Sequence, residues 1–128
     1  DVYAPCALGG TLNSHTIPLL KCKVVAGAAN NQLAKKEDAL RLKRNGILYS
    51  PDYVINAGGL INVDLERNGA WNESLALEKV GKIAESLDEI FSRVEADDKL
   101  TTRQASAELA RERLRAAAVR QDSNKNDW

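Results

Sequence analysis

The chain is 128 residues long, which is enough for one domain with a hydrophobic core. It carries 18 lysines and arginines against 18 aspartates and glutamates, so its formal net charge is zero. This balance argues against nucleic acid as a main partner, because phosphate backbones require clustered positive charge. No apolar run approaches the roughly 20 residues of a membrane span, and the chain starts with no recognisable signal peptide. We therefore expect no nucleic-acid partner and no membrane partner.

The few sulfur and imidazole side chains do not indicate a metal site. Cys6 and Cys22 have neither metal-ligand spacing nor the pattern of a disulfide framework, and His15 has no second ligand nearby. We interpret all three as structural or surface residues, which favours a reduced, cytoplasmic setting. The chain contains no methionine and opens directly on a strand-like "DVYAP", so we expect it to be a piece of a longer protein.

The first fifty residues predict short strands alternating with short helices. Strands are expected at residues 2–4, ending at Pro5, at "VVAGAA" from Val24, and at "ILY". A helical turn is expected in "SHTIPLL", and "KEDALRLKRNG" predicts a helix that Gly46 ends. This alternation indicates a parallel α/β sheet. Since three strands make a small sheet, we expect at least one edge to pair with something outside the chain.

The second half of the chain predicts long helices. From Asn72 onward, apolar residues recur at spacings of three and four, which predicts a long helix with Asn72 as its N-cap. Thr101 and Gln104 have capping-box spacing and are expected to open a last helix that runs to about residue 119. The segment 121–128 is polar and is expected to fray, apart from the indole of Trp128.

Small and amide-bearing residues follow each predicted strand, in "PCALGG", "GAANNQ" and "NAGG". The carboxyl ends of parallel strands share one edge, where open α/β sheets bind their ligands. The amides of Asn30, Asn31 and Asn56 can donate and accept, which suits an uncharged carboxamide-bearing ring or an amino-acid zwitterion. Gly58 and Gly59 are expected to free the backbone so that Asn56 turns towards the ligand. Taken alone each motif is weak, and the favoured interpretation of "NAGG" alone is then a helix cap and a turn.

In combination the motifs are specific. The segments "YAPCALGG", "TIPLLKCKVVAGAANNQL" and "GILYSPDYVINAGGLINV" resemble the carboxyl-terminal half of the Glu/Leu/Phe/Val amino-acid dehydrogenase family, and within it leucine dehydrogenase. The resemblance is dense over residues 1–63, looser over 64–96, and returns at "ELARERL". It implies the distal half of an NAD-binding, Rossmann-type parallel sheet at 1–63, a carboxyl-terminal helical segment at 64–120 and a polar tail at 121–128.

The resemblance also implies a reaction and a set of site residues. Members of this family oxidatively deaminate an L-amino acid to its 2-oxo acid and ammonia, and pass hydride to NAD. Carried over residue by residue, the resemblance places Cys6, Ala7, Ala28, Ala29, Asn30 and Asn56 along the cofactor. It places Asn30, Leu60 and Val63 at the substrate.

Several parts of the family pattern are missing from the chain. The glycine-rich phosphate loop, the two catalytic lysines and their aspartate partner are absent, so we expect no catalytic residues here and no activity of the chain alone. The expected partners are the amino-acid substrate, an amino-terminal catalytic domain and, in the full-length protein, further copies in a homo-oligomer. Leu60 stands where the family usually has valine, and Asp64, Leu65, Arg67 and Trp71 depart from the leucine-enzyme pattern. The alternative hypothesis is a non-catalytic α/β remnant that acts as a helical protein-interaction module.

Overall fold

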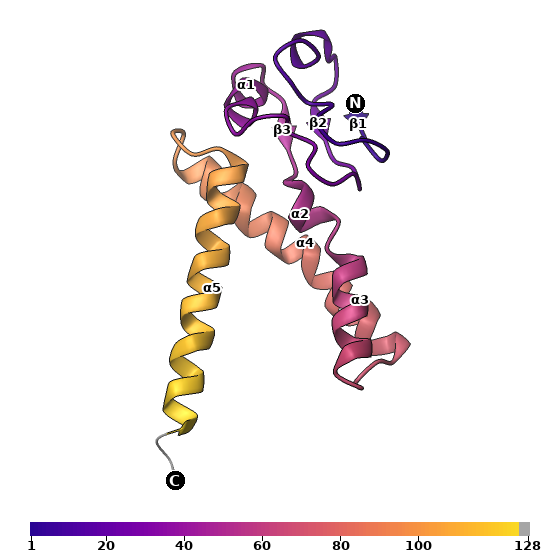
Figure 1. Cartoon of the computed structure of the whole chain (residues 1–128). Helices are drawn as coiled ribbons and strands as arrows, with labels where there is room; N and C mark the ends of the chain where they lie inside the picture. Colours follow the sequence, from indigo (N-terminus) through magenta and orange to yellow (C-terminus); the bar gives the residue numbers. More distant parts are fainter. Residues whose placement is uncertain (126–128) are drawn as a thin grey trace.

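The structure is a computed structural model that describes the backbone of residues 1–125 and the side chains of residues 1–119 (Figure 1). The first fifty residues form a small sheet with short helices, and the remainder of the chain forms longer helices. Figure 1 shows the sheet at one end and α5 (Thr102–Lys125) projecting away from it, with α2 (Asp52–Ile55) between the sheet and the long helices. The position of α2 is important for the site described below.

The sheet is parallel and contains three strands of two residues each: β1 (Val2–Tyr3), β2 (Val24–Val25) and β3 (Leu48–Tyr49). Their spatial order is β1-β2-β3, and Val24 pairs with Val2 on one side and Leu48 on the other. The predicted fold class, a parallel α/β sheet followed by long helices, is confirmed. Within the described residues, the outer sides of β1 and β3 carry no partner strand, and Val2 is 62% exposed.

A hydrophobic core packs against the sheet. The 3-10 helix η1 (Ile17–Leu19) and the helix α1 (Asp38–Arg44) supply part of it, and the half-buried Cys22 packs against it. Gly46 follows α1 with φ +67°, a left-handed conformation that favours glycine, so the predicted end of this helix is confirmed. The buried core residues are Leu12, Ile17, Val25, Leu42, Ile47 and Tyr49.

Both predicted helix caps are present. Asn72 Oδ1 accepts from Leu75 N at 2.8 Å and opens α4 (Glu73–Ala96). Thr101 Oγ1 accepts from Gln104 N at 3.3 Å, and Gln104 Oε1 accepts from Thr101 N at 2.9 Å, which is the reciprocal pattern of a capping box.

The last helix, α5 (Thr102–Lys125), runs six residues beyond the expected end near residue 119, so that expectation was wrong. The polar tail at 121–128 stays a prediction. No glycine or proline interrupts residues 120–125, and the polar residues there are compatible with a helix. Trp128 lies outside the described residues.

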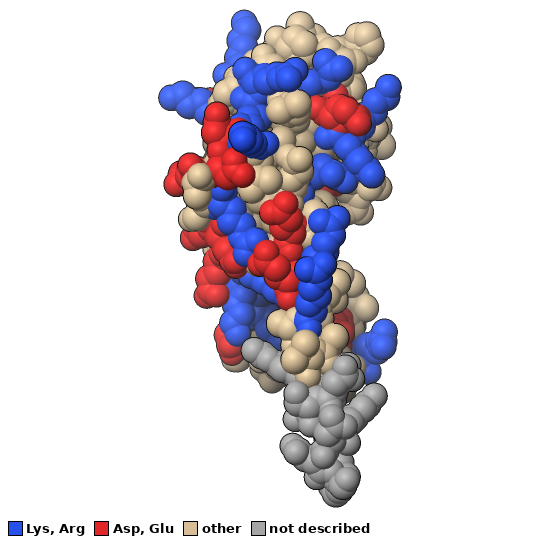
Figure 2. All heavy atoms as spheres, turned by 90° about the vertical axis from the view of Figure 1, so that its left-hand side faces the viewer, with Lys and Arg blue, Asp and Glu red and all other residues tan. Residues whose placement is uncertain are grey.

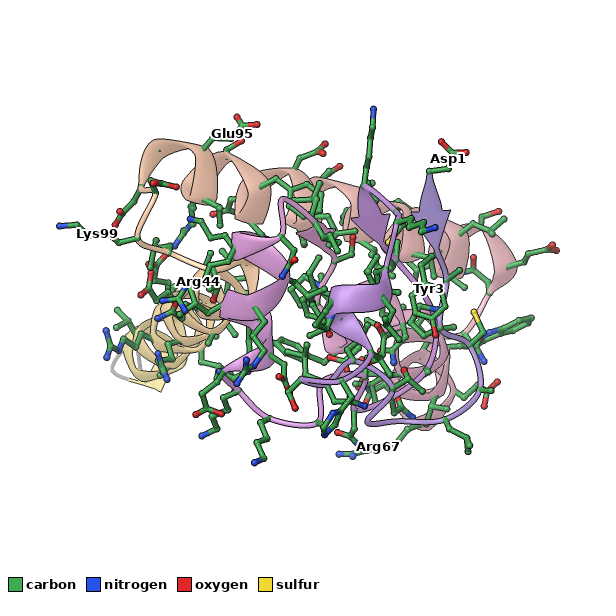
Figure 3. The ribbon with its side chains drawn as sticks, turned by 90° about the horizontal axis from the view of Figure 1, so that it is seen from above. Asp1, Tyr3, Arg44, Arg67, Glu95 and Lys99 are labelled. Atoms are coloured by element: carbon green, nitrogen blue, oxygen red, sulfur yellow. The ribbon has the colours of Figure 1, made fainter. Side chains whose placement is uncertain are left out.

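The long helices meet in a second core and in a set of ion pairs. Ile90, Ala105 and Leu109 are buried between α4 and α5, and Val54 of α2 packs against them. Arg93 on α4 makes bonds of 3.0 and 2.7 Å to the two carboxylate oxygens of Glu112 on α5. Figure 2 shows mixed positive and negative side chains along this face. Glu95 and Lys99 lie at the connection between α4 and α5. Seen from above, Asp1 and Tyr3 lie on the other side of the molecule from these two residues (Figure 3).

The two glycines of "NAGG" do not form the turn that we expected. Gly58 and Gly59 are the first two residues of α3 (Gly58–Arg67), and neither has a positive φ. The chain turns earlier, at Asn56 and Ala57, the residues between α2 (Asp52–Ile55) and α3. The expected domain boundary after Val63 falls inside α3, which continues to Arg67. Over the described part of the chain, no helix is both long and apolar enough to span a membrane.

Candidate functional site

The segments that follow the three strands lie together at the carboxyl edge of the sheet. Ala29 N donates to Pro5 O at 2.9 Å, which joins the segment after β2 to the segment after β1. Gly10 N donates to Asn31 O at 2.7 Å and joins the same two segments a second time. The predicted convergence of "PCALGG" and "GAANNQ" on one edge therefore follows from backbone hydrogen bonds.

Two glycines allow these segments to approach closely. A Cβ atom on Gly27 would lie 2.3 Å from Pro5 O and 2.5 Å from Pro5 N. A Cβ atom on Gly9 would lie 2.8 Å from Asn30 O. Because the opposing atoms are backbone atoms, they cannot swing aside as the end of a side chain could. The edge of the sheet is thus built on positions where only glycine fits.

The side chains of Asn30 and Asn56 contact each other directly. Asn56 Nδ2 donates to Asn30 Oδ1 at 2.6 Å and, more distantly, to Ala28 O at 3.4 Å. Among the side chains that the structure describes, Asn30 Nδ2 and Asn56 Oδ1 have no further partner. The pair therefore offers one donor and one acceptor, which is the complement of a carboxamide. Asn56 is also the residue that caps the end of α2. It therefore serves as a helix cap and also presents its side-chain amide at the sheet edge, the two roles considered for it in the sequence analysis.

Asn31, the third predicted amide, has a different role. Its backbone is left-handed, with φ +52°, a conformation that asparagine tolerates better than most residues. Its carbonyl accepts from Gly10. The structure thus makes Asn31 a turn residue beside the asparagine pair.

Gln32 holds the loop after β2 from inside, and the sequence analysis did not identify it. It is fully buried, and its Nε2 donates to Gly27 O at 2.7 Å and to Ala29 O at 2.9 Å. Its backbone N–H donates to Asp52 Oδ2 at 3.1 Å, which ties the loop to the start of α2. Gln32 Oε1 is buried without a hydrogen-bond partner in the structure. The spacing of apolar residues does not predict a buried polar side chain such as Gln32. Asp52 was easier to recognise, because it follows Pro51 directly and an acidic residue there is typical of a first helical turn.

Tyr49 and Asp52 complete the inner side of the site. Asp52 N donates to the Tyr49 hydroxyl at 3.2 Å, and Asp52 Oδ1 accepts from Tyr53 N at 3.0 Å. Burial raises the pKa of Tyr49 far above its ordinary value, and the nearby Asp52 carboxylate raises it further. The phenol therefore stays neutral at physiological pH, as a structural hydrogen-bonding group.

The remaining predicted site residues differ in how much surface they offer. Cys6, Ala7 and Ala28 are exposed at the sheet edge. Ala29 is buried, and both its N–H and its C=O are bonded within the chain, to Pro5 O and Gln32 Nε2. Leu60 and Val63 lie one helical turn apart on α3 and are 74% and 57% exposed, so they share an apolar face that nothing in the described chain covers.

The side chains that contact each other at this edge are two carboxamides, those of Asn30 and Asn56. No three His, Cys, Asp or Glu residues come together among the described residues. The Asn30–Asn56 pair can bind and orient an uncharged polar group. It cannot take up or release a proton near neutral pH, because a carboxamide does not titrate there.

The chain is an α/β domain with a parallel sheet and amide-bearing loops at the carboxyl edge of that sheet. Open α/β sheets bind their ligands at this edge. The family model for Glutamate/Leucine/Phenylalanine/Valine dehydrogenase matches residues 1–122. The chain therefore belongs to the Glu/Leu/Phe/Val dehydrogenase family.

Two relatives illustrate this membership. L-tryptophan dehydrogenase from Nostoc punctiforme is 50% identical over 115 residues, which cover 89% of this chain and 32% of the relative. Leucine dehydrogenase from Geobacillus stearothermophilus is 44% identical over 114 residues, which cover 89% of this chain and 30% of the relative. The chain thus spans about a third of the length of these proteins.

The crystal structure of L-tryptophan dehydrogenase from Nostoc punctiforme shares the fold, with a TM-score of 0.86 and 49% identity. The superposition covers 92% of this chain and 36% of that one.

Proposed function

We propose that the chain is the part of an NAD-dependent L-amino-acid dehydrogenase that holds the nicotinamide end of the cofactor and one wall of the substrate pocket. The observation that carries this proposal is the Asn30–Asn56 pair, which presents one free donor and one free acceptor at the carboxyl edge of a parallel sheet. Nicotinamide carries an uncharged carboxamide, and this donor set fits it. Family membership supports the same assignment.

In this proposal each group of the chain has a limited task. A cofactor held there would supply the acceptor for the hydride that leaves the α-carbon of the amino acid. Asn30 and Asn56 orient the nicotinamide ring by its carboxamide, and Asn30 also lies towards the substrate. Cys6, Ala7 and Ala28 would form the exposed surface along which the cofactor lies, mostly through backbone, and the buried Ala29 would support that surface from below. The carboxamides of Asn30 and Asn56 do not titrate near neutral pH, so we assign proton transfer to the roughly two thirds of the relatives' length that this chain does not span.

We propose an amino acid with an apolar side chain as the substrate. Leu60 and Val63 are apolar and exposed on one face of α3, and neither could pair with a second carboxylate. Burying the side chain of glutamate against them would cost free energy, because its charge would be unpaired. The names of the relatives, tryptophan, phenylalanine and leucine dehydrogenase, are consistent with this class. A cytoplasmic location and a homo-oligomeric full-length protein stay predictions.

The test compares the isolated chain with the intact protein that contains it. Both are assayed with NAD and leucine, valine, phenylalanine, tryptophan or glutamate, following the absorbance of the reduced cofactor. We expect turnover by the intact protein with the apolar amino acids and none by the isolated chain. Asn56→Ala in the intact protein should weaken NAD binding. Asn68→Ala is the matched control, because Asn68 caps the end of α3 and, within the described residues, bonds only to Asp64 and Glu66 of that helix.

Two results would contradict the proposal. An intact protein without dehydrogenase activity on any amino acid would favour the alternative, a non-catalytic helical interaction module. A variant with Asn56→Ala that binds NAD as tightly as the parent would remove the asparagine pair from the cofactor site.

A further inference from the structure

The short helix α2 connects the sheet edge to the long helices, and almost every residue in it makes a different connection. At four residues it is too short to be stable by itself, because helix nucleation costs more than its few backbone bonds return. Its orientation must therefore come from its side-chain contacts. The contacts of Asp52, Tyr53, Val54 and the capping residue Asn56 show what those are.

On one side, α2 reaches the loops of the candidate site. Asp52 Oδ2 accepts from Gln32 N, and Asn56 Nδ2 donates to Asn30 Oδ1. These contacts place the carboxamide of Asn56 at the sheet edge. They also mean that any rotation of α2 about its axis would move this carboxamide away from Asn30.

On the other side, α2 reaches α5. The hydroxyls of Tyr53 and Ser106 are hydrogen-bonded to each other, and the Tyr53 hydroxyl also lies 3.4 Å from Arg103 O. Ser106 is buried and donates to Arg103 O at 3.0 Å, which leaves its oxygen to accept the proton of Tyr53. Val54 packs beside this contact, against the core shared by α4 and α5.

We propose that the Tyr53–Ser106 hydrogen bond makes α5 a positioning element for Asn56. Tyr53 and Asn56 are three residues apart, so the bond to Ser106 sets the rotation of the helical turn that ends in Asn56. Ser106 lies 53 residues further along the chain than Tyr53, on α5. Tyr53 is thus a positioning residue, which acts on the cofactor through Asn56. This inference rests on the proposed function only for its effect on NAD.

The structure offers a matched pair of variants. Ser106→Ala and Tyr53→Phe each remove one hydroxyl from the α2–α5 contact and keep the packing. Ser86→Ala is the control. Ser86 on α4 accepts a hydrogen bond from Arg113 on α5 at 2.9 Å, so this substitution also removes a bond to α5. Ser86 makes no hydrogen bond to α2. All variants are made in the intact protein. Equilibrium binding of NAD, melting temperature and the side-chain amide resonances of Asn56 in protein labelled with ¹⁵N-asparagine are measured.

We expect Tyr53→Phe and Ser106→Ala each to weaken NAD binding by about 2- to 10-fold, the range that loss of one hydrogen bond gives. The Asn56 resonances should shift in both variants and stay at their parental positions in Ser86→Ala. The double variant should bind NAD no more weakly than either single variant, because both substitutions remove the same bond.

The proposal is overturned if both single variants keep the parental affinity and the parental Asn56 resonances. It is also overturned if Ser86→Ala weakens NAD binding and shifts the Asn56 resonances as much as Ser106→Ala does, because the effect would then come from α4–α5 packing in general. If the parent protein does not bind NAD, the proposed function fails, and the Asn56 resonances still decide whether α5 positions this residue.

Discussion

Replacing Gly27 with alanine tests the closest approach in the site. The added Cβ would lie 2.3 Å from Pro5 O, 2.5 Å from Pro5 N and 2.7 Å from Pro5 Cδ. To reach an ordinary contact distance, the segment after β1 must move by about 1 Å, because an unstrained Cβ contact begins near 3.4 Å. That movement would break the bond of 2.9 Å between Ala29 N and Pro5 O.

The expected cost follows from these two effects. Overpacking costs about 1–3 kcal/mol and the lost hydrogen bond about 0.5–1.5 kcal/mol, so we expect a loss of about 1.5–4.5 kcal/mol in the free energy of unfolding. Gly81→Ala is the matched control. Gly81 lies inside α4 with nothing within 4 Å of a Cβ, so alanine there should stabilise the helix by about 0.5–1 kcal/mol.

The assay combines melting temperature with hydrogen exchange of backbone amides in the intact protein. For Gly27→Ala we expect a lower melting temperature and faster exchange at residues 26–31, with a fall in NAD affinity. Gly81→Ala should melt at or above the parental temperature. The reasoning is refuted if Gly27→Ala melts like the parent and its amides at residues 26–31 exchange at parental rates, since the two segments would then not lie as close as the structure places them.

Three further predictions concern the loop, the helix pair and the pocket. Gln32→Glu places a carboxylate against two backbone carbonyl oxygens, so it should loosen the loop by about 1–3 kcal/mol at neutral pH and less when the glutamate is protonated. Hydrogen-exchange protection of this loop, compared with the parent at each of two pH values, checks this. An equal loss of protection at both pH values would contradict it. The Arg93 guanidinium holds the pKa of Glu112 below its ordinary value, so the pair stabilises the fold above the pKa of unfolded glutamate, about 4.3, and this contribution is lost as pH falls through the lower folded-state pKa. The melting-temperature difference between parent and Glu112→Gln should therefore shrink on acidification, and a constant difference would remove the ion pair as its cause. Leu60→Ala should shift substrate preference towards bulkier side chains by about 1–3 kcal/mol per methylene-sized change, measured as kcat/KM for valine, leucine, phenylalanine and tryptophan. An unchanged ranking of these substrates would show that Leu60 does not line the pocket. A parent protein that prefers glutamate would contradict the assignment of substrate class.

Local chemistry explains what the sequence predicted well. The caps at Asn72 and Thr101 depend on side chains within three residues of the backbone groups that they satisfy, so their spacing is visible in the sequence. The three strands follow from short apolar segments bounded by turn residues, and their parallel order from the helices between them. The same local rules were insufficient at Gly58 and Gly59, because a glycine pair is compatible with a turn and with the start of a helix.

The sequence by itself determined the class of fold, the helix caps and, through the spacing of its motifs, the family. Only the tertiary structure decided which amide pairs with which. Asn30 and Asn56 meet because Gln32, buried and polar, holds the loop that carries Asn30, and because its backbone N–H bonds to Asp52 at the start of α2. It also decided that α2 is hydrogen-bonded, through Tyr53, to Ser106 of α5, 53 residues further along the chain. Such contacts depend on distances between segments remote in sequence, and the residue types alone do not specify those distances.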